Sequence, residues 1–399
     1  MDLGNGLGHL TYSTLVHPAD DWEQLWNSLN TYLPKVKARF AGNKSFGVCI
    51  RLSAKTAATL AGSEAERAKL KKFLEANDMY VYTANAFVYG HFKGDKVKEE
   101  VYEPDWRSEE RTQYTINVAN VLADVCPPGI APSIQTAPLG YKPRVTGNDV
   151  IATYTNNVLR VVAHLMALEQ KTGRTVQLAL EPEPFCFLET TDETIAFFRD
   201  HLYSGAAVEK LAKLAHVPIA EANEALRRHL GIVYDICHQA VEFEDIGASL
   251  QKLVDAGVPV FKLQEAAALH IPDVKQDAVN TLKKYAKTIY LTQTLEKRNG
   301  KLTKFLNVDD AIAAFEKDPV GPREWRTHIH VPVFLEDLGQ FRTTRFAIAD
   351  AMRFHKSKPL SRHLEVETYT WDVLPESAKS NDIVDYICRE LDWVKSQLV

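Results

Sequence analysis

The 399-residue chain contains few cysteines, and their arrangement excludes two common kinds of structural site. The five residues are widely separated and never form a C-x-x-C pair: Cys49, Cys126, Cys186, Cys237 and Cys388. A zinc ribbon needs closely spaced pairs, and a disulfide framework is normally built from an even number of cysteines. The pattern is typical of a protein from a reducing compartment.

An excess of positive charge is also absent. The chain has 47 Lys and Arg residues against 52 Asp and Glu residues, which gives a formal net charge of −5. Proteins that hold the phosphate backbone of nucleic acids are usually basic in at least one domain. We therefore expect a small-molecule ligand and no nucleic-acid partner.

Long apolar runs and nucleotide-binding loops are missing too. No window approaches 18 uninterrupted apolar residues, and residues 1–6 show no basic segment followed by an apolar one. We therefore expect no membrane insertion and no signal peptide, and place the protein in the cytoplasm. The glycine-rich segment Gly4–Gly8 precedes the first expected strand, whereas a dinucleotide-binding loop follows one.

Short β-rich segments alternate with helical patterns along most of the chain. The first helical pattern has apolar residues at Trp22, Leu25, Trp26 and Leu29, the spacing of one helix face. We expect strands at 9–14, 46–52, 79–85, 132–136, 176–180, 231–234, 258–263 and 364–368. Eight strands, each followed by a helix or a long excursion, predict an α/β fold of the (β/α)8 TIM-barrel type.

Three stretches are longer than such a barrel needs, namely residues 89–111, 200–229 and 266–361. Each follows the carboxyl end of an expected strand, where the loops of a barrel form its mouth and carry its site. We found no internal repeat and no Pro/Gly-rich linker. The sequence therefore predicts one domain over residues 1–399, with long loops and insertions at the C-terminal mouth.

Polar residues end four of the expected strands, where side chains point into the mouth. Strand five ends in Glu181, with Glu183 two residues later. Strand six ends in Asp235, with His238 one helical turn beyond it, and strand seven ends in Gln264.

The eighth expected strand carries Glu365 and Glu367 on one face, and Glu367 lies nearer its C-terminal end. Carboxylates gathered at one mouth repel each other unless a cation lies between them. Oxygen ligands with one or two nitrogens suit Mn²⁺, Mg²⁺, Co²⁺ or Zn²⁺. A single strand-end Glu can equally pair with a loop Arg, and Asp-x-x-His can be a helix cap.

A second cluster is His328-Ile329-His330, whose alternation directs both imidazoles to the same side as a metal pair or a substrate clamp. The same segment also fits a core strand whose histidines bond to the backbone. Arg51, Asn85 and Tyr89 lie at or beyond other strand ends and are candidate substrate contacts.

The segments around these residues resemble the xylose-isomerase-like barrels, a superfamily of sugar and sugar-phosphate isomerases and epimerases that also includes endonuclease IV. The YDICH segment that contains Asp235 is similar to the family's Asp-Thr-Cys-His stretch, and VETY is similar to its terminal Glu-Thr segment. The whole chain more closely resembles the metabolite traffic protein EboE family. The matching segments, between residues 9 and 375, are HLTYSTLVHP, VYEPDWR, NNVLRVVAHL, LALEPEPFCFLETT, YDICHQAVEFED, HIHVPVFLEDLG and LEVETYTWDVLP.

The resemblance to the epimerase branch implies that Glu181, Asp235 and Glu367 bind a divalent metal and that His238 contacts the substrate. The family's ligand at the end of strand seven is histidine, so Gln264 is a departure, for which His330 could compensate. The endonuclease branch has histidine at the ends of strands three and four, where this chain has Asn85 and Thr136. A DNA-repair activity is therefore not expected.

The leading hypothesis is an isomerase or epimerase of a sugar, cyclitol or sugar phosphate, in a pathway of metabolite biosynthesis or export. Glu181 and Glu367 would act as base and acid through a metal-stabilised enediolate, while Glu183, His238 and His328 orient hydroxyl groups. A non-catalytic metabolite-binding protein and a metal-dependent hydrolase or lyase remain alternatives. Homo-oligomerisation and partners from the same gene cluster are left open.

Overall fold

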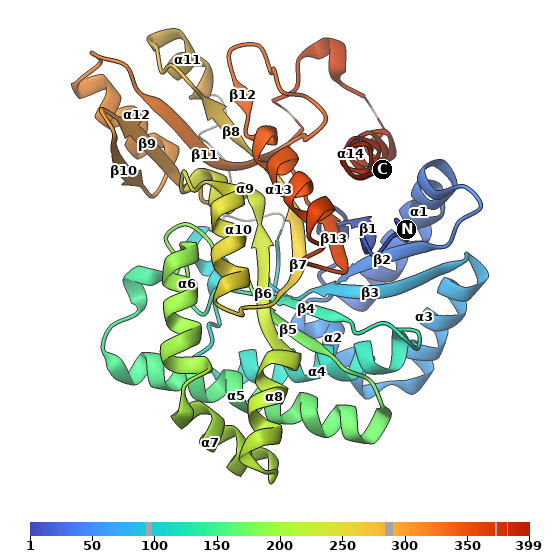
Figure 1. Cartoon of the computed structure of the whole chain (residues 1–399). Helices are drawn as coiled ribbons and strands as arrows, with labels where there is room; N and C mark the ends of the chain where they lie inside the picture. Colours follow the sequence, from blue (N-terminus) through green and yellow to red (C-terminus); the bar gives the residue numbers. More distant parts are fainter. Residues whose placement is uncertain (93–97, 284–289, 372, 381) are drawn as a thin grey trace.

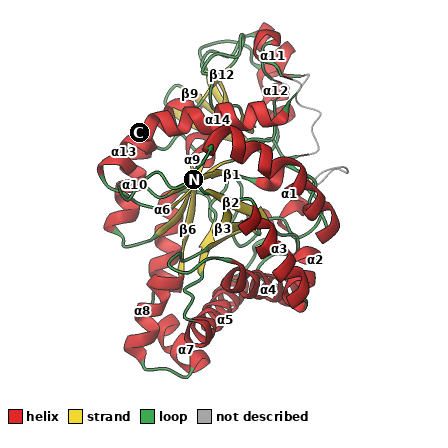
Figure 2. Ribbon diagram, turned by 90° about the vertical axis from the view of Figure 1, so that its right-hand side faces the viewer, coloured by secondary structure: helices red, strands yellow, loops and turns green. Residues whose placement is uncertain are grey.

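Eight parallel strands form a nearly closed barrel inside a ring of helices (Figures 1 and 2). The computed structural model describes residues 1–92, 98–283, 290–371, 373–380 and 382–399. The barrel strands are β1 (His9–Tyr12), β2 (Phe46–Arg51), β3 (Met79–Asn85), β4 (Ser133–Thr136), β5 (Gln177–Leu180), β6 (Leu230–Asp235), β7 (Val260–Glu265) and β13 (His363–Val366). Their order is β1-β13-β7-β6-β5-β4-β3-β2, and a bridge between Ser13 and Cys49 joins the two ends. The predicted (β/α)8 fold is confirmed.

Capping residues explain where several of the surrounding helices begin and end. The Ser63 side chain accepts a hydrogen bond from the Glu66 backbone at the start of α3, and left-handed Gly173 ends α5. Pro34 lies inside α1. The helices outside the 266–361 insert are α1 (Trp22–Val36), α2 (Ala54–Gly62), α3 (Glu64–Ala76), α4 (Glu109–Val125), α5 (Asn148–Thr172), α6 (Thr191–Phe197), α7 (Gly205–Ala215), α8 (Ile219–His229), α9 (Ile236–Val241), α10 (Ile246–Asp255) and α14 (Ile383–Leu398).

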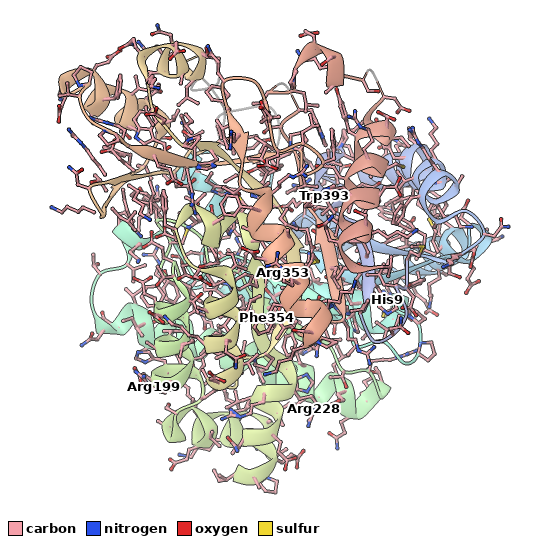
Figure 3. All side chains as sticks on the ribbon, turned by 45° about the horizontal axis from the view of Figure 1, so that its top comes forward. His9, Arg199, Arg228, Arg353, Phe354 and Trp393 are labelled. Carbon is pink, nitrogen blue, oxygen red and sulfur yellow. The ribbon has the colours of Figure 1, made fainter. Side chains whose placement is uncertain are left out.

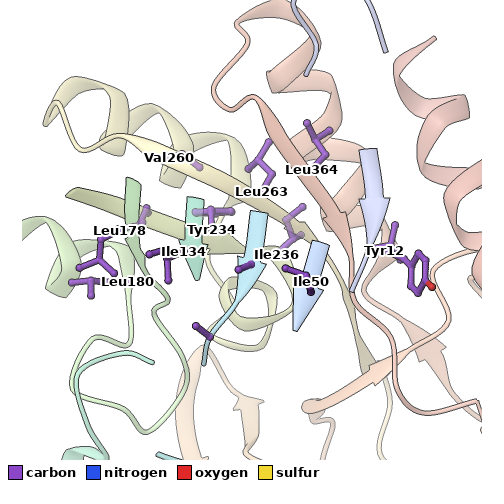
Figure 4. Close-up of a cluster of buried hydrophobic side chains, with 14 of the residues drawn as sticks. Tyr12, Ile50, Ile134, Leu178, Leu180, Tyr234, Ile236, Val260, Leu263 and Leu364 are labelled. Atoms are coloured by element: carbon purple, nitrogen blue, oxygen red, sulfur yellow. The ribbon is translucent and has the colours of Figure 1, made fainter. Parts of the chain in front are cut away.

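The strands bury apolar side chains on one face and polar side chains on the other. Ile134, Leu178, Leu180, Tyr234 and Leu263 belong to a continuous apolar core, part of which Figure 4 shows. The intervening residues, which alternation directs to the opposite face, include several that are polar and fully buried: Thr83, Ser133, Gln135, Lys262, Gln264 and Glu365. The barrel interior is thus a polar environment enclosed by an apolar layer.

The 266–361 stretch forms a second, smaller sheet beside the mouth of the barrel (Figure 1). Its strands, in the order β10-β9-β11-β8-β12, pair antiparallel. They are β8 (Ala267–Ile271), β9 (Thr294–Arg298), β10 (Lys301–Phe305), β11 (Glu324–Val331) and β12 (Arg342–Thr343), with helices α11 (Gln276–Leu282), α12 (Val308–Lys317) and α13 (Arg345–Ser357). A register shift in β11 between Thr327 and His330 interrupts its pairing with β8.

The other two long stretches differ in position. The pair α7 and α8 packs against α5 at the end of the molecule away from the small sheet, so this insert does not cover the mouth as the sequence suggested (Figure 1). Figure 3 shows Arg199 and Arg228 at this lower end. Residues 93–97 of the 89–111 stretch and 284–289 of the 266–361 stretch lie outside the described residues. Among the described residues, no helix is long and apolar enough to cross a membrane.

Candidate active site

A cavity opens at the C-terminal ends of the barrel strands. Its polar wall consists of Asn85, Lys98, Gln135, Glu181, Glu183, His238, Gln293, His328, His330 and Glu367. Its apolar wall includes Leu15, Phe87, Val88, Phe92, Val101, Tyr102, Tyr290, Leu291 and Tyr369. The cavity therefore suits a small ligand with one polar side and one face that packs on aromatic rings.

The amide nitrogen of Gln264 lies between three carboxylates. Gln264 Nε2 donates to Asp235 Oδ2 at 2.6 Å, to Glu367 Oε2 at 2.9 Å and to Glu181 Oε1 at 3.0 Å. Gln264 Oε1 is buried and has no hydrogen-bond partner. Reversing the amide would place that oxygen among the carboxylate oxygens, so the observed orientation is the favourable one.

A buried chain of polar groups below the cavity orients Glu181. Gln135 Nε2 donates to Glu181 Oε2 at 2.6 Å, and Gln135 Oε1 accepts from the ammonium of Lys262. Lys262 in turn pairs with Glu365, and both side chains are fully buried. The cation of Lys262 thus fixes the orientation of the Gln135 amide, which holds one oxygen of Glu181 in place.

Two further donors hold Glu367. Its Oε1 accepts from Ser13 Oγ at 3.0 Å and from Asn85 Nδ2 at 3.1 Å. Burial, together with the neighbouring carboxylates of Glu365 and Asp235, raises the pKa of Glu367 to about 8. Burial and the charges of Glu367 and Asp235 also raise the pKa of Glu181 well above its usual value. Two cavity carboxyls can therefore hold protons near neutral pH.

Three histidines converge beside the carboxylates. His238 Nε2 lies 3.2 Å from His328 Nε2, and His328 Nε2 lies 3.1 Å from His330 Nε2. Burial lowers the pKa of His330 to about 4 and that of His328 well below its usual value. Asp235 is both a cap and part of this cluster, since its Oδ1 accepts from the His238 backbone and its Oδ2 lies 3.4 Å from His238 Nε2.

Glu183 belongs to the rim of the same cavity. It accepts hydrogen bonds from Tyr102 Oη at 2.6 Å and from Gln293 Nε2 at 3.3 Å. Burial raises the pKa of the Glu183 carboxyl, while the nearby His238 opposes the rise. Glu183 Oε1 also lies 3.6 Å from His328 Nδ1, so this carboxylate joins the barrel to the small sheet.

Most, but not all, of the residues predicted for the site meet at this cavity. Asn85, Glu181, Glu183, His238, His328, His330 and Glu367 line it, and Gln264 and Asp235 contact that lining. Arg51 does not line it, because its guanidinium pairs with Asp20 and with the Gly90 carbonyl. Tyr89 packs instead against Arg111 and Tyr114. These two residues have structural contacts in place of the predicted substrate contacts.

Among the polar and aromatic residues that line this cavity, sequence reasoning missed Phe92, Lys98, Tyr102, Gln135, Tyr290, Gln293 and Tyr369. Gln135 carried a usable signal, because strand alternation places it on the face opposite the apolar Ile134. Tyr102 and Gln293 come from the long inserts, where the pattern of the chain gives no register with the barrel. Tyr369, two residues after Glu367, stacks on His330 with ring centroids 4.7 Å apart.

The residues present offer a metal two different environments. The expected set of Glu181, Asp235, Gln264 and Glu367 fits a cation poorly, because a hydrogen-bond donor from Gln264 lies between the carboxylates. Three overlapping groups have ligand atoms within 4.8 Å of one another: Asp235 with His238 and His330, Glu183 with His238 and His328, and Cys237 with His328 and His330. The structure therefore contains a His/Glu/Asp cluster that could hold a metal.

Comparison with known proteins supports the fold assignment. No family model and no curated protein matches the chain. A xylose isomerase-like TIM barrel protein from Mycobacterium smegmatis in complex with magnesium aligns at a TM-score of 0.50 and 9% identity, over 98% of this chain and 96% of that one.

Other solved structures align over similar lengths. IOLI protein with a binding zinc atom aligns at a TM-score of 0.48 and 13% identity, over 98% of this chain and 99% of that one. L-ribulose 3-epimerase aligns at a TM-score of 0.47 and 10% identity, over 98% of this chain and 94% of that one. The alignment with the xylose isomerase-like TIM barrel protein, at a TM-score of 0.50, supports the barrel fold seen in this chain.

Proposed function

We propose that this protein is a metal-dependent isomerase or epimerase of a sugar, cyclitol or sugar phosphate, related to the EboE family and active in a cytoplasmic pathway of metabolite biosynthesis or export. The observation that carries the proposal is the pair Glu181 and Glu367. Both carboxyls line the cavity, both are buried, and both have raised pKa values. Such groups can exchange a proton with a substrate carbon near neutral pH.

The two carboxyls come from different sides of the barrel. Glu181 follows β5 and Glu367 follows β13, and strands β7 and β6 separate the two in the sheet. Glu181, oriented by Gln135, takes a proton from a carbon next to a carbonyl group. Glu367, held by Ser13 and Asn85, returns a proton to the neighbouring or opposite position. Each such transfer typically accelerates a reaction about 10²–10⁴-fold.

The other cavity residues bind and orient the substrate. Glu183 offers a polar contact to hydroxyl groups, and Phe92, Tyr290 and Tyr369 form an aromatic surface for the carbon face of a ring. A divalent cation, when bound at the histidine cluster, supplies electrostatic stabilisation of the oxyanion that proton removal creates. The apolar wall excludes water from the reacting carbon.

A second candidate is a non-catalytic metabolite-binding protein that retains the barrel cavity. The observation that favours it is Gln264, which replaces the histidine of the family pattern and satisfies three carboxylates without a cation. A binding protein needs the shape and hydrogen bonds of the cavity, but no carboxyl that exchanges protons.

The decisive test is solvent hydrogen exchange. The purified protein, supplied with Mn²⁺, Co²⁺ or Zn²⁺, is incubated in D₂O with a panel of ketoses, cyclitols and their phosphates. Mass spectrometry should show deuterium entering one position of at least one compound, and Glu181→Gln and Glu367→Gln should each reduce the rate by about 10²-fold or more. Retained ligand affinity with no deuterium uptake would support the binding protein instead.

A further inference from the structure

Hydrogen bonds determine where the three clustered histidines carry their protons. His238 Nδ1 lies 2.8 Å from the Pro182 carbonyl oxygen, and His330 Nδ1 lies 2.9 Å from the Glu367 carbonyl oxygen. A carbonyl oxygen only accepts hydrogen bonds, so both Nδ1 atoms must be protonated donors.

The same conclusion holds for His328, whose Nδ1 lies 3.0 Å from Gln293 Oε1. The orientation of that amide is fixed, because Gln293 Nε2 donates to Tyr102 Oη at 3.1 Å and to the Pro184 carbonyl at 3.3 Å. Gln293 Oε1 therefore accepts, and His328 Nδ1 donates.

With all three protons on Nδ1, each neutral imidazole presents the lone pair of Nε2 to the others. Neighbouring Nε2 atoms are only 3.1–3.2 Å apart. Because a neutral imidazole carries a single N–H, the neutral rings have no hydrogen left to place between these atoms. Asp235 adds a carboxylate oxygen, which lies 3.4 Å from His238 Nε2 and 3.8 Å from His330 Nε2. These four electron-rich atoms are thus linked by four close contacts of 3.1, 3.2, 3.4 and 3.8 Å in a buried space, which is favourable around a cation.

The separations also suit a transition metal. Zinc binds imidazole nitrogen at about 2.0–2.1 Å in tetrahedral geometry, which places two nitrogen ligands roughly 3.3 Å apart. Each outward-facing Nδ1–H donates to a carbonyl or amide oxygen, and such hydrogen bonds orient histidine ligands of metals. A site with three nitrogens and one oxygen favours Zn²⁺, Co²⁺ or Fe²⁺ over Mg²⁺.

We propose that the metal of this barrel is bound by Nε2 of His238, His328 and His330 together with Oδ2 of Asp235. The Gln264 amide occupies the space between Glu181, Asp235 and Glu367 in place of a cation. Two ligands come from the small sheet and two from the strand-six region, so the insert supplies half of the site. The assignment concerns metal binding alone and stands whether or not the proposed isomerase activity is found.

This arrangement changes the roles of the carboxyls. Glu181 and Glu367 are not ligands, so both remain available to hold and move protons. Glu367 is still tied to the metal centre, because its backbone carbonyl accepts the Nδ1 proton of His330. A movement of the His330 ring on metal binding would therefore reach the residue that exchanges protons.

The test measures metal binding by the full-length protein without any substrate. The chain is stripped with a chelator, and binding of Zn²⁺ and Co²⁺ is followed by calorimetry and by elemental analysis. We expect one tightly bound ion. His328→Ala and His330→Ala should each weaken binding by more than about 100-fold, whereas loss of a residue that only hydrogen-bonds to a ligand typically weakens it about 10–100-fold. Glu181→Gln and Gln264→Leu should change it less than about tenfold.

Two variants serve as controls within the same region. His270→Ala removes a half-buried histidine of the small sheet that pairs with Glu324, and it should retain full metal affinity. Cys237→Ser should also retain it, and the Co²⁺ spectrum should lack a thiolate charge-transfer band. Circular dichroism of each metal-free variant checks that the fold is intact.

Several results would overturn the assignment: absence of any stoichiometric metal, metal loss in Cys237→Ser, or greater loss in Glu181→Gln than in His328→Ala. A proton shared among the histidines would then explain the cluster. Failure of the isotope-exchange experiment with metal binding intact would count against the proposed activity and leave the site assignment standing.

Discussion

Asp235 and Gln264, at the ends of neighbouring strands β6 and β7, share a hydrogen bond of 2.6 Å beside the residues that line the cavity. The same aspartate oxygen lies 3.4 Å from His238 Nε2. Asp235 is therefore the point where the carboxylate cluster and the histidine cluster meet. The Asp235 carboxylate accepts a hydrogen bond from the Gln264 amide on one side, and its negative charge can still balance a metal cation at the histidines on the other side.

Replacing Gln264 with Leu should destabilise the metal-free protein in a pH-dependent manner. The substitution removes the donor shared by three buried carboxylates, and hydrogen bonds to charged groups contribute about 1.5–3 kcal/mol. The loss should be larger near pH 9, above the Glu367 pKa of about 8, than near pH 6, where Glu367 keeps its proton. Urea unfolding at pH 6 and pH 9 measures the loss in free energy of unfolding. An equal loss at the two pH values would show that the ionised carboxylates do not depend on the Gln264 amide. Gln113→Leu, on the exposed face of α4, is the control.

Replacing Lys262 with Met should strongly destabilise the fold. The substitution leaves the fully buried Glu365 without its partner, and removal of one member of a buried ion pair typically costs about 3–5 kcal/mol. The double variant Lys262→Met with Glu365→Leu removes both charges and should recover much of that loss. Equilibrium unfolding of the single and double variants provides the measurement. A double variant no more stable than Lys262→Met would show that the pair is not the cause.

Removal of the Ser13 hydroxyl should move the titration of Glu367 to higher pH. Ser13 Oγ donates to Glu367 Oε1 at 3.0 Å, which stabilises the ionised carboxylate and lowers its pKa. In Ser13→Ala the pKa should rise from about 8 by roughly one unit. The pH dependence of kcat/KM, or infrared titration of the carboxyl, reports the shift. Ser28→Ala, whose hydroxyl bonds to the Pro18 carbonyl away from the cavity, should leave it unchanged.

Stability should fall as the pH rises, and Glu390 should account for part of the effect. Burial raises the pKa of Glu390 to about 8, so the native state retains a proton that the unfolded chain loses near pH 4.5. The stabilisation is complete below pH 4.5 and is lost as the pH rises to 8, by an amount on the order of a few kcal/mol. Glu390→Gln keeps an acceptor for Thr368 and Val333 and should flatten the profile. An unchanged slope in chemical unfolding between pH 5 and 8 would contradict this.

The barrel could be predicted because its strands carry a strong local signal. Apolar residues alternate with polar ones, and a carboxylate or amide stands at strand ends such as Glu181, Asp235 and Gln264. The position of these residues follows from the barrel topology alone, since parallel strands bring their carboxyl ends to one mouth. The cluster around them was accordingly foreseeable.

The partners supplied by the inserts could not be predicted in the same way. His328 and His330 were recognised as a pair, but their convergence on His238 depends on how the small sheet packs against the barrel. Gln293 and Tyr102 orient that pair from distant points of the chain, and no period in the sequence relates them. The direction of the Gln264 amide depends likewise on three carboxylates that only the folded chain brings together.

The most direct measurement is anomalous X-ray diffraction from crystals of the full chain loaded with Zn²⁺ and recorded on both sides of the zinc absorption edge. The account predicts one strong peak among Nε2 of His238, His328 and His330 and Oδ2 of Asp235, with Gln264 still bonded to Glu181 and Glu367. A peak in the place of the Gln264 amide, bound by Glu181 and Glu367, would contradict it.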